Sequence, residues 1–310
     1  MTVRSESLTK VTRPSRAGDR VFSTLVTGAG VLILAILGGV AAFLLIRGWP
    51  ALTAAADKLP GNQTFWHYVW PLTFGTILSS TIAIILAVPL AVGVALFITY
   101  FAPKRIANTL AALIDLLAAI PSVIYGLWGI AVLGPAAVGL QAWLYDHLDF
   151  LPFFKGPPSP TGRTMFVLGI VLAVMILPII SAIVREVFAQ TPRSLREGSL
   201  ALGATRWEMI RMTVLPFGRP AIISASMLGL GRALGETMAV ALILSVSGGV
   251  TFNLISSGNP STIAANIALN FPESSGLAIN LLIATGLVLF GITLLVNSAA
   301  RLIISRQIRE

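Results

Sequence analysis

The chain has 310 residues, of which 56% are hydrophobic and only 11% are charged, and its formal net charge at pH 7 is +9. Charged residues alone make up about a quarter of a typical soluble domain, so this composition excludes an ordinary water-soluble enzyme or binding domain. Cysteine is absent, which excludes disulfides, thiolate metal ligands and cysteine nucleophiles. The sequence is therefore expected to fold in a lipid bilayer.

Six apolar segments are long enough, at about 20 residues, to cross a hydrocarbon core of roughly 30 Å. The first is not expected to be a cleavable signal peptide, because its apolar run is too long and residues 46–49 offer no small-residue cleavage site. We predict an all-α membrane protein with six transmembrane helices. The predicted spans are Phe22–Ile46, Leu72–Phe101, Asn108–Leu133, Thr164–Ala189, Pro220–Val246 and Leu277–Ile304.

Basic residues are concentrated in alternate loops. If the N-terminus is cytoplasmic, 16 of the 21 Lys and Arg residues lie on the cytoplasmic side, and four lie outside, namely Arg47, Lys58, Lys155 and Arg163. Cytoplasmic loops of membrane proteins carry an excess of Lys and Arg, so this bias predicts that both termini are cytoplasmic. Membrane topology then explains the positive charge, and nucleic-acid binding is not needed.

The same topology divides the chain. We expect a polar cytoplasmic tail over residues 1–21, a first transmembrane helix over 22–46, a core of five transmembrane helices over 72–304, and a short cytoplasmic tail over 305–310. The core contains the long cytoplasmic loop 190–219. The loops expected on the opposite side are rich in Gly, Pro, Asn and Ser and are predicted to be irregular: Arg47–Pro71, Gly134–Arg163 and Ser247–Gly276.

The cytoplasmic loop 190–219 contains two helix-start patterns. Ser194 with Glu197, and Thr205 with Glu208, each match S/T-x-x-E, in which side chains satisfy the free amides of a helix start. Both pairs are predicted to be capping boxes. The loop is therefore expected to form two short helices.

Two further residues punctuate this loop. Gly203 lies between the predicted helices, where a left-handed residue is expected to end the first one, and Pro216 is expected to end the second. Such a hairpin is suited to a groove of another protein, but it could equally be an amphipathic connector that rests on the membrane surface. Spacing alone does not separate these two interpretations.

A family resemblance favours the first interpretation. Glu197, Gly203 six positions later and Leu215-Pro216 twelve positions further resemble the EAA loop of ABC importer permeases, E-A-A-x3-G-x9-I-x-L-P. Gly198 and Ser199 replace the two alanines, and Thr213 replaces the isoleucine. The resemblance implies that the loop docks into an ATPase through Glu197, Gly198, Ser199, Ala201, Leu202, Gly203 and Ala204.

Two other stretches narrow the resemblance. They are DLLAAIPSVIYGLWG at residues 115–129 and MLGLGRALGETMAV at residues 227–240. With the long outside loop after the first, they resemble the PstC-type permeases of the Pst phosphate importer over about residues 70–305. This implies a six-span MetI-like permease of the bacterial inner membrane that passes inorganic phosphate into the cytoplasm. The implied partners are a PstA-like permease subunit, two copies of a PstB-like ATPase and a PstS-like phosphate-binding protein.

The chain carries no recognisable chemistry of its own. Nothing matches G-x-x-x-x-G-K-[ST], the loop whose amides cradle nucleotide phosphates, so ATP and Mg are expected on the partner ATPase. His67 and His147 are isolated in the sequence, and the carboxylates are not clustered. We expect no catalytic site, no metal site and no cofactor bound by this chain.

Charged residues inside the predicted spans are candidates for a substrate pathway, because a charge at the centre of a bilayer costs at least about 2.5 to 3.5 kcal/mol. Asp115, Arg232 and Glu236 qualify, and Ser122 follows a proline in the third span. Arg232 and Glu236 are four residues apart, hence predicted to share one helix face and to pair. The pathway is predicted to contain Arg232, Glu236, Asp115 and Ser122, although a self-neutralising ion pair, and a helix-pairing role for Asp115, remain open.

Three functional classes fit these features to different degrees. An ABC importer permease fits best, and an ion-coupled secondary transporter of a small anion is the alternative, since charges within spans could couple substrate to protons. A membrane enzyme is remote. Uptake that depends on an ATPase and survives collapse of the proton gradient separates the first two classes.

Overall fold

The computed structural model describes residues 17–246 and 249–307, and the side chains of 18–246 and 249–302. Residues 1–16 of the predicted N-terminal tail, and residues 308–310, lie outside the described residues. The all-α prediction is confirmed, because the described residues form helices with one isolated bridge between Val246 and Asn259. The chain divides into two compact units, residues 1–46 and residues 47–310.

The first unit consists, in its described part, of one apolar helix. Helix α1 runs over Ala17–Thr53 and continues past the boundary between the units. Its side chains up to residue 46 are largely exposed, including Leu34 and Ile46. An apolar helix with exposed side chains is expected where the solvent is lipid.

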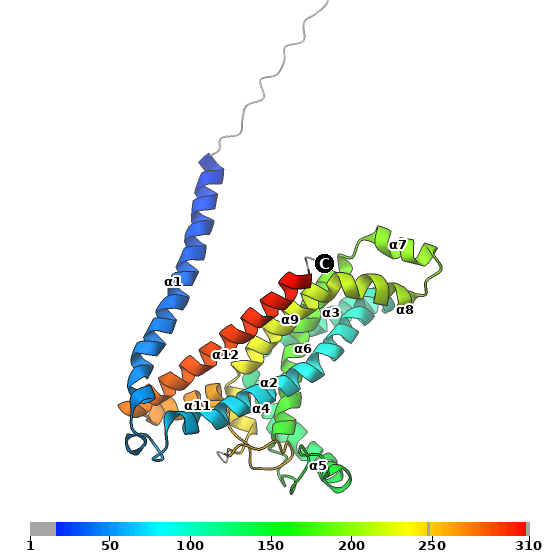
Figure 1. The fold of residues 1–310 in the computed structure, drawn as a ribbon. Coiled ribbons are helices and arrows are strands. Elements are labelled where there is room, and N and C mark those ends of the chain that lie inside the picture. The colour runs from blue at the N-terminus through cyan, green and yellow to red at the C-terminus, as the bar shows by residue number, and fades with distance from the viewer. Residues whose placement is uncertain (1–16, 247–248, 308–310) are drawn as a thin grey trace, which may run out of the picture. The chain divides into compact units, whose positions relative to one another are not determined.

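The second unit contains the other helices (Figure 1). Short π-helical stretches join some of them, and single 3₁₀ turns cover Ala56–Lys58 and Phe271–Glu273. The π-helical stretches are η2 (Phe97–Phe101), η3 (Gly129–Leu133) and η4 (Ile210–Val214). The α-helices are α2 (Phe65–Leu96), α3 (Lys104–Ala118), α4 (Ser122–Trp128), α5 (Gly134–Leu148), α6 (Met165–Ala189), α7 (Arg193–Ala201), α8 (Arg206–Met209), α9 (Leu215–Leu234), α10 (Met238–Ile243), α11 (Ile263–Asn270) and α12 (Leu277–Gln307).

The prediction of six transmembrane helices is confirmed by length and composition. The fourth and sixth predicted spans match α6 and α12 closely. The second is extended at its start, and the third and fifth are displaced. The six candidate spans in the structure are Gly18–Thr53, Phe65–Phe101, Ser122–Leu148, Met165–Ala189, Arg206–Leu234 and Leu277–Leu302.

The third predicted span, Asn108–Leu133, is wrong in position. Helix α3 ends at Ala118, and a new helical stretch begins at Ser122 and continues through η3 into α5. Pro121 has no amide hydrogen and disfavours helical backbone at Ile120, so the chain breaks there. Consequently the predicted irregular loop that begins at Gly134 starts with a helix, and Leu148 closes the third span.

The fifth predicted span, Pro220–Val246, is also displaced. Its helical stretch starts in the predicted cytoplasmic loop at Arg206 and ends at Leu234, before residues 235–237. The predicted stop at Pro216 is wrong, because the π-turn η4 lets the amide of Leu215 bond to the carbonyl of Ile210, and Pro216 falls in the first turn of α9. A proline is tolerated there, since the first helical amides need no partner within the helix.

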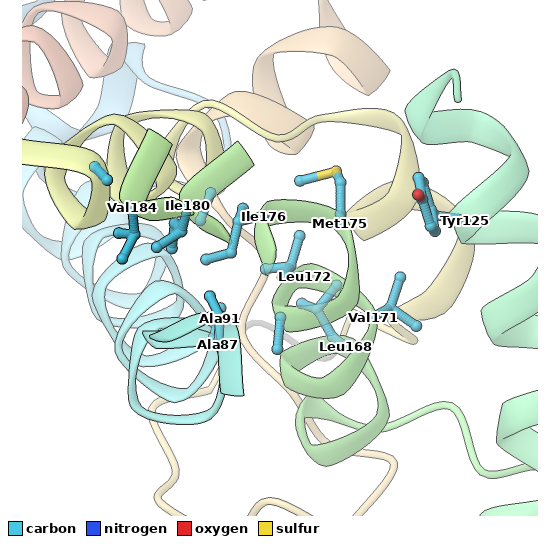
Figure 2. Packing of buried hydrophobic residues seen from close by; sticks show 14 of the residues in the cluster. Ala87, Ala91, Tyr125, Leu168, Val171, Leu172, Met175, Ile176, Ile180 and Val184 are labelled. Atoms are coloured by element: carbon cyan, nitrogen blue, oxygen red, sulfur yellow. The ribbon is translucent and has the colours of Figure 1, made fainter. Parts of the chain in front are cut away.

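The core lies where α2 packs along α6 and α6 along α9. Four alanines of α2, spaced four residues apart, are fully buried: Ala83, Ala87, Ala91 and Ala95. Figure 2 shows two of them facing the long side chains of α6. Small residues let membrane helices approach closely, which replaces the hydrophobic driving force that is absent in lipid. The packed helices α2, α6 and α9 hold the residues of the candidate site in place.

Candidate functional site

The hairpin of α7 and α8 confirms part of the sequence prediction. Gly203 has a φ of +86°, the left-handed conformation that glycine adopts without strain. Thr205 and Glu208 form the predicted capping box: the Thr205 amide donates to Glu208 Oε2 at 2.8 Å, and the Glu208 amide donates to Thr205 Oγ1 at 3.3 Å. Gly203 thus ends the first helix, and the capping box begins the second, so the turn between them has a defined conformation.

The other predicted capping box is wrong. Helix α7 begins at Arg193 after Pro192, and no side chain caps it. Ser194 and Glu197 thus lie inside the helix and not around its start. Pro192 has a φ of −54°, close to the helical value, so its ring presets the chain for a helix at the next residue.

The residues predicted to couple to an ATPase form one exposed surface on this hairpin. Leu202 is 91% exposed, and a side chain added at Gly198 or Gly203 would meet no atom within 4 Å. Leu195, Leu200 and Trp207 are exposed nearby. The hairpin extends beyond the end of the α2, α6 and α9 bundle (Figure 1). Its surface is open to a partner.

The end of the fifth span is broken next to Arg232. Helix α9 ends at Leu234, and α10 begins at Met238. Glu236 falls in the break, so the predicted i, i+4 helical pairing with Arg232 is wrong in its geometry. The Glu236 carboxylate, 7% exposed, instead accepts a hydrogen bond from the amide of Ala239 at 3.1 Å and caps the start of α10.

Arg163 holds the other end of α10. Its Nη2 donates to the carbonyls of Leu242 at 3.0 Å and Leu244 at 3.4 Å, and its Nε donates to that of Ile243 at 3.3 Å. The last carbonyls of a helix lack partners within it and carry partial negative charge, so a guanidinium satisfies them well. The short helix is thus fastened by one charged side chain at each end.

Arg232 lines an open hollow between α6, α9 and α12, with a volume of about 550 Å³. The Nε of Arg232 is buried and has no hydrogen-bond partner among the described residues. Burying a donor of a guanidinium without a partner is costly. Arg185 Nη1 and Arg196 Nε are buried without a partner too, but of these three arginines only Arg232 lines this hollow. The hollow is lined by Ile179, Ser224, Met227, Leu228, Gly231, Arg232 and Asn297.

Helix α4 brings Tyr125 toward Arg232, whereas Ser122, like Asp115, is not a lining residue of the hollow. Tyr125 is buried, donates to the carbonyl of Leu117 at 2.8 Å and lies within electrostatic reach of Arg232. Ser122, half-buried, begins α4 one turn earlier. A Cβ on Gly126 would lie 2.9 Å from Ala239 Cα, so α4 packs directly on α10. Helix α4 therefore lies against the helix that follows the break.

Asp115 does not join this group. It lies on α3 and pairs with Arg185 of α6 at 3.4 Å, with the two side chains 57% and 22% exposed, respectively. It is not a lining residue of the hollow around Arg232. Its position supports the helix-pairing role that the sequence left open.

Comparison with known proteins assigns the family. Residues 87–309 match the family described as "Binding-protein-dependent transport system inner membrane component". The chain belongs to this family. It is 47% identical over 303 residues to "Phosphate transport system permease protein PstC 2" of Mycobacterium bovis, covering 94% of this chain and 93% of that protein. It is 40% identical over 313 residues to "Phosphate transport system permease protein PstC" of Xylella fastidiosa, covering 96% and 94%.

A solved structure supports the fold. A chain of "a bacterial ABC transporter involved in the import of the acidic polysaccharide alginate" superimposes with a TM-score of 0.56 at 20% identity, covering 93% of this chain and 99% of that chain. The predicted family and the MetI-like importer permease fold are thereby confirmed. The chain is a multi-pass inner-membrane component of a binding-protein-dependent ABC importer.

Sequence reasoning missed three residues of this permease. In the sequence, Arg163 looks like an ordinary arginine of an outside loop. Its role is hidden because the carbonyls that it contacts are about 80 positions away. Tyr125 reads as an interior aromatic residue until Arg232 is placed near it. Asn297 offered a signal, since an amide within the long apolar run of α12 is unusual and a polar group in a span is a functional candidate.

Proposed function

We propose that this permease carries inorganic phosphate across the inner membrane, with Arg232 as the principal contact for the ion in transit. The observation that carries the proposal is the buried, unpartnered Nε of Arg232 at a hollow between spanning helices. The PstC relatives, at 40% and 47% identity over nearly the whole chain, support phosphate as the substrate.

The chemistry of arginine suits this substrate. Phosphate carries between one and two negative charges near neutral pH and must lose much of its hydration to cross a membrane. A guanidinium stays charged where a lysine could lose its proton, and its fork matches two phosphate oxygens at once. Glu236 lies in the break that follows α9, and its negative charge competes with phosphate for the Arg232 guanidinium, which eases release of the ion.

The site would work within a larger assembly. We infer that a PstS-like protein delivers phosphate on the outer side and that a PstA-like subunit completes the pathway. Two PstB-like ATPases supply the energy, and one of them docks on residues Glu197–Ala204. ATP and Mg belong to those ATPases, and this chain binds no cofactor. Both termini are cytoplasmic in this assembly, which places the hairpin on the same side as the ATPases.

Reconstituted transport tests the function directly. The four-component assembly in proteoliposomes should accumulate phosphate only when ATP and the binding protein are present, and accumulation should persist after an uncoupler collapses the proton gradient. Uptake that needs no ATPase and stops with the uncoupler would establish the alternative, an ion-coupled secondary transporter. Uptake of sulfate but not phosphate would overturn the substrate.

A further inference from the structure

Asn297 shares the hollow with Arg232. Helix α12 packs along α9, and Asn297 faces the hollow from α12. The nine residues before it, 288–296, are Val-Leu-Phe-Gly-Ile-Thr-Leu-Leu-Val, so the amide follows an almost wholly apolar stretch. Asn297 is exposed in this chain and lies in the last part of the span, before Ser298 and Arg301. An exposed amide on a spanning helix costs free energy against lipid, so it is expected to face a polar surface or a pathway.

The hollow extends along helix α9. It follows α9 from Arg232, beside the break, to Ser224, eight residues nearer the hairpin, a distance of about 12 Å along the helix. Helical side chains lean toward the start of their helix, so the Arg232 guanidinium is directed along the hollow toward Ser224. Ser224 thus lies on the side of the hollow that faces the coupling hairpin.

The polar groups complement hydrogen phosphate. The Ser224 hydroxyl already donates to the carbonyl of Pro220 at 2.9 Å, which leaves its oxygen as an acceptor. The Asn297 amide offers two donor hydrogens and one acceptor oxygen. Hydrogen phosphate presents ionised oxygens that need donors and a hydroxyl group that needs an acceptor, whereas sulfate has no hydroxyl group at neutral pH.

We propose that Asn297, assisted by Ser224, forms a second phosphate-binding position that receives the ion from Arg232 and recognises it as a protonated oxyanion. This inference rests on the proposed function. A neutral amide holds the ion less tightly than a guanidinium, so transfer to Asn297 frees phosphate from its strongest contact and allows release toward the cytoplasm.

A substitution series at Asn297 tests the inference in the assembled transporter. Asn297→Leu should lower phosphate uptake about tenfold or more, the scale of one lost hydrogen bond to a charged group. Asn297→Asp should lower it further, because a carboxylate cannot donate and repels the anion. Asn297→Gln should restore part of the uptake. Thr293→Val is the matched control, since the Thr293 hydroxyl is one turn away and is satisfied by the carbonyl of Phe290 at 2.8 Å.

Thiol protection gives a readout independent of transport. The chain has no cysteine, so Asn297→Cys places a single thiol in it, measured against the background of the parent assembly. Inorganic phosphate should slow the reaction of this thiol with a maleimide several-fold, while sulfate at equal ionic strength should slow it less. The thiol of Thr293→Cys should react at the same rate with and without phosphate.

The outcomes separate this inference from the proposed function. If Arg232→Gln abolishes uptake while Asn297→Leu and Asn297→Asp transport like the parent, the second position is wrong and the function stands. If Asn297→Leu fails to co-purify with the second permease subunit, the amide is an interface residue and the inference is also wrong. If the parent assembly does not transport phosphate, the proposed function itself fails.

Discussion

Two arginines lie at the ends of consecutive helices, and their surroundings differ. Arg163 reaches the end of α10, where three backbone carbonyls accept from its guanidinium. Arg232 lies near the end of α9, where its buried Nε has no partner among the described residues and an open hollow adjoins it. Both occupy positions where a helix terminus favours a cation. Arg185 Nη1 and Arg196 Nε are also buried without a partner, so what sets Arg232 apart from Arg163 is an unused donor together with an adjoining hollow.

The strongest test of this comparison is Arg232→Gln. We expect phosphate uptake to be lost, by at least about a hundredfold, because two charge-assisted hydrogen bonds disappear together. Membrane insertion and thermal stability should be unchanged, since Arg232 donates no hydrogen bond to a backbone carbonyl among the described residues. Arg232→Lys should retain intermediate uptake, because a point charge replaces the fork. Parent-like uptake in Arg232→Gln at equal expression would remove the distinction between the two arginines.

A change in the hairpin turn before this helical stretch should stop uptake by another route. Gly203→Val requires a branched residue at a φ of +86°, which strains the turn, and adds bulk to the open hairpin surface. We expect the ATPase to be lost on co-purification while the permease remains inserted, whereas Arg232→Gln should keep its ATPase. An ATPase that stays bound to Gly203→Val, with unchanged uptake, contradicts the docking proposal.

Arg163→Gln should act on stability first. An amide side chain cannot satisfy three carbonyls, so α10 should lose its fastening, at a cost of about 1.5 to 3 kcal/mol for hydrogen bonds to a charged donor. The melting temperature in detergent should fall, and uptake should fall only in proportion to folded protein. A normal melting temperature with abolished uptake would place Arg163, too, in the ligand pathway.

Substitutions at Glu236 separate the role of its side chain as a helix cap from the effect of its negative charge. Glu236→Gln keeps an oxygen that can accept from the Ala239 amide, so stability should be retained while uptake falls several-fold through loss of the negative charge near Arg232. Glu236→Ala should also destabilise the protein by about 1 kcal/mol, the usual cost of a lost helix cap. If Glu236→Gln transports like the parent, the carboxylate is only a cap.

The smallest effect is expected at the ion pair between Asp115 and Arg185. Asp115→Asn breaks the pair with Arg185, but Asp115 is 57% exposed, and exposed ion pairs contribute about 0 to 1 kcal/mol. Uptake should change less than twofold, and the melting temperature by a few degrees at most. A large loss of uptake would return Asp115 to the predicted pathway.

The accuracy of the sequence predictions followed the physical signal at each element. The predicted fourth span matches helix α6 to within one residue. Its largely apolar stretch of 25 residues has about the length that a bilayer requires and is bounded by polar residues at both ends, which leaves little choice of position. The break at Pro121 and the passage through Pro216 were missed, since an apolar run containing proline looks the same whether the helix ends there or continues through a π-turn. Hydropathy identifies spans but does not determine their register.

The candidate site was predictable only in part, for a related reason. Arg232 stood out because a lone charge in a span is rare. Its geometry with Glu236 was wrong, because the helix ends at Leu234 and the four-residue rule applies only within a helix. The contacts of Arg163 and the placement of Asn297 join segments distant in sequence, which only the folded chain brings together.

The π-turn η4 makes one mechanical element of α8 and α9. Without an intervening loop, helical backbone extends from Trp207 in the hairpin to Arg232 at the hollow, about 40 Å at 1.5 Å per residue. A movement of the hairpin is therefore carried toward Arg232 along helical backbone, and the π-turn, Pro216 and Pro220 are the points where this backbone is expected to bend. The stretch is a jointed arm: a tilt of its exposed end reaches the guanidinium reduced by the bending at these points.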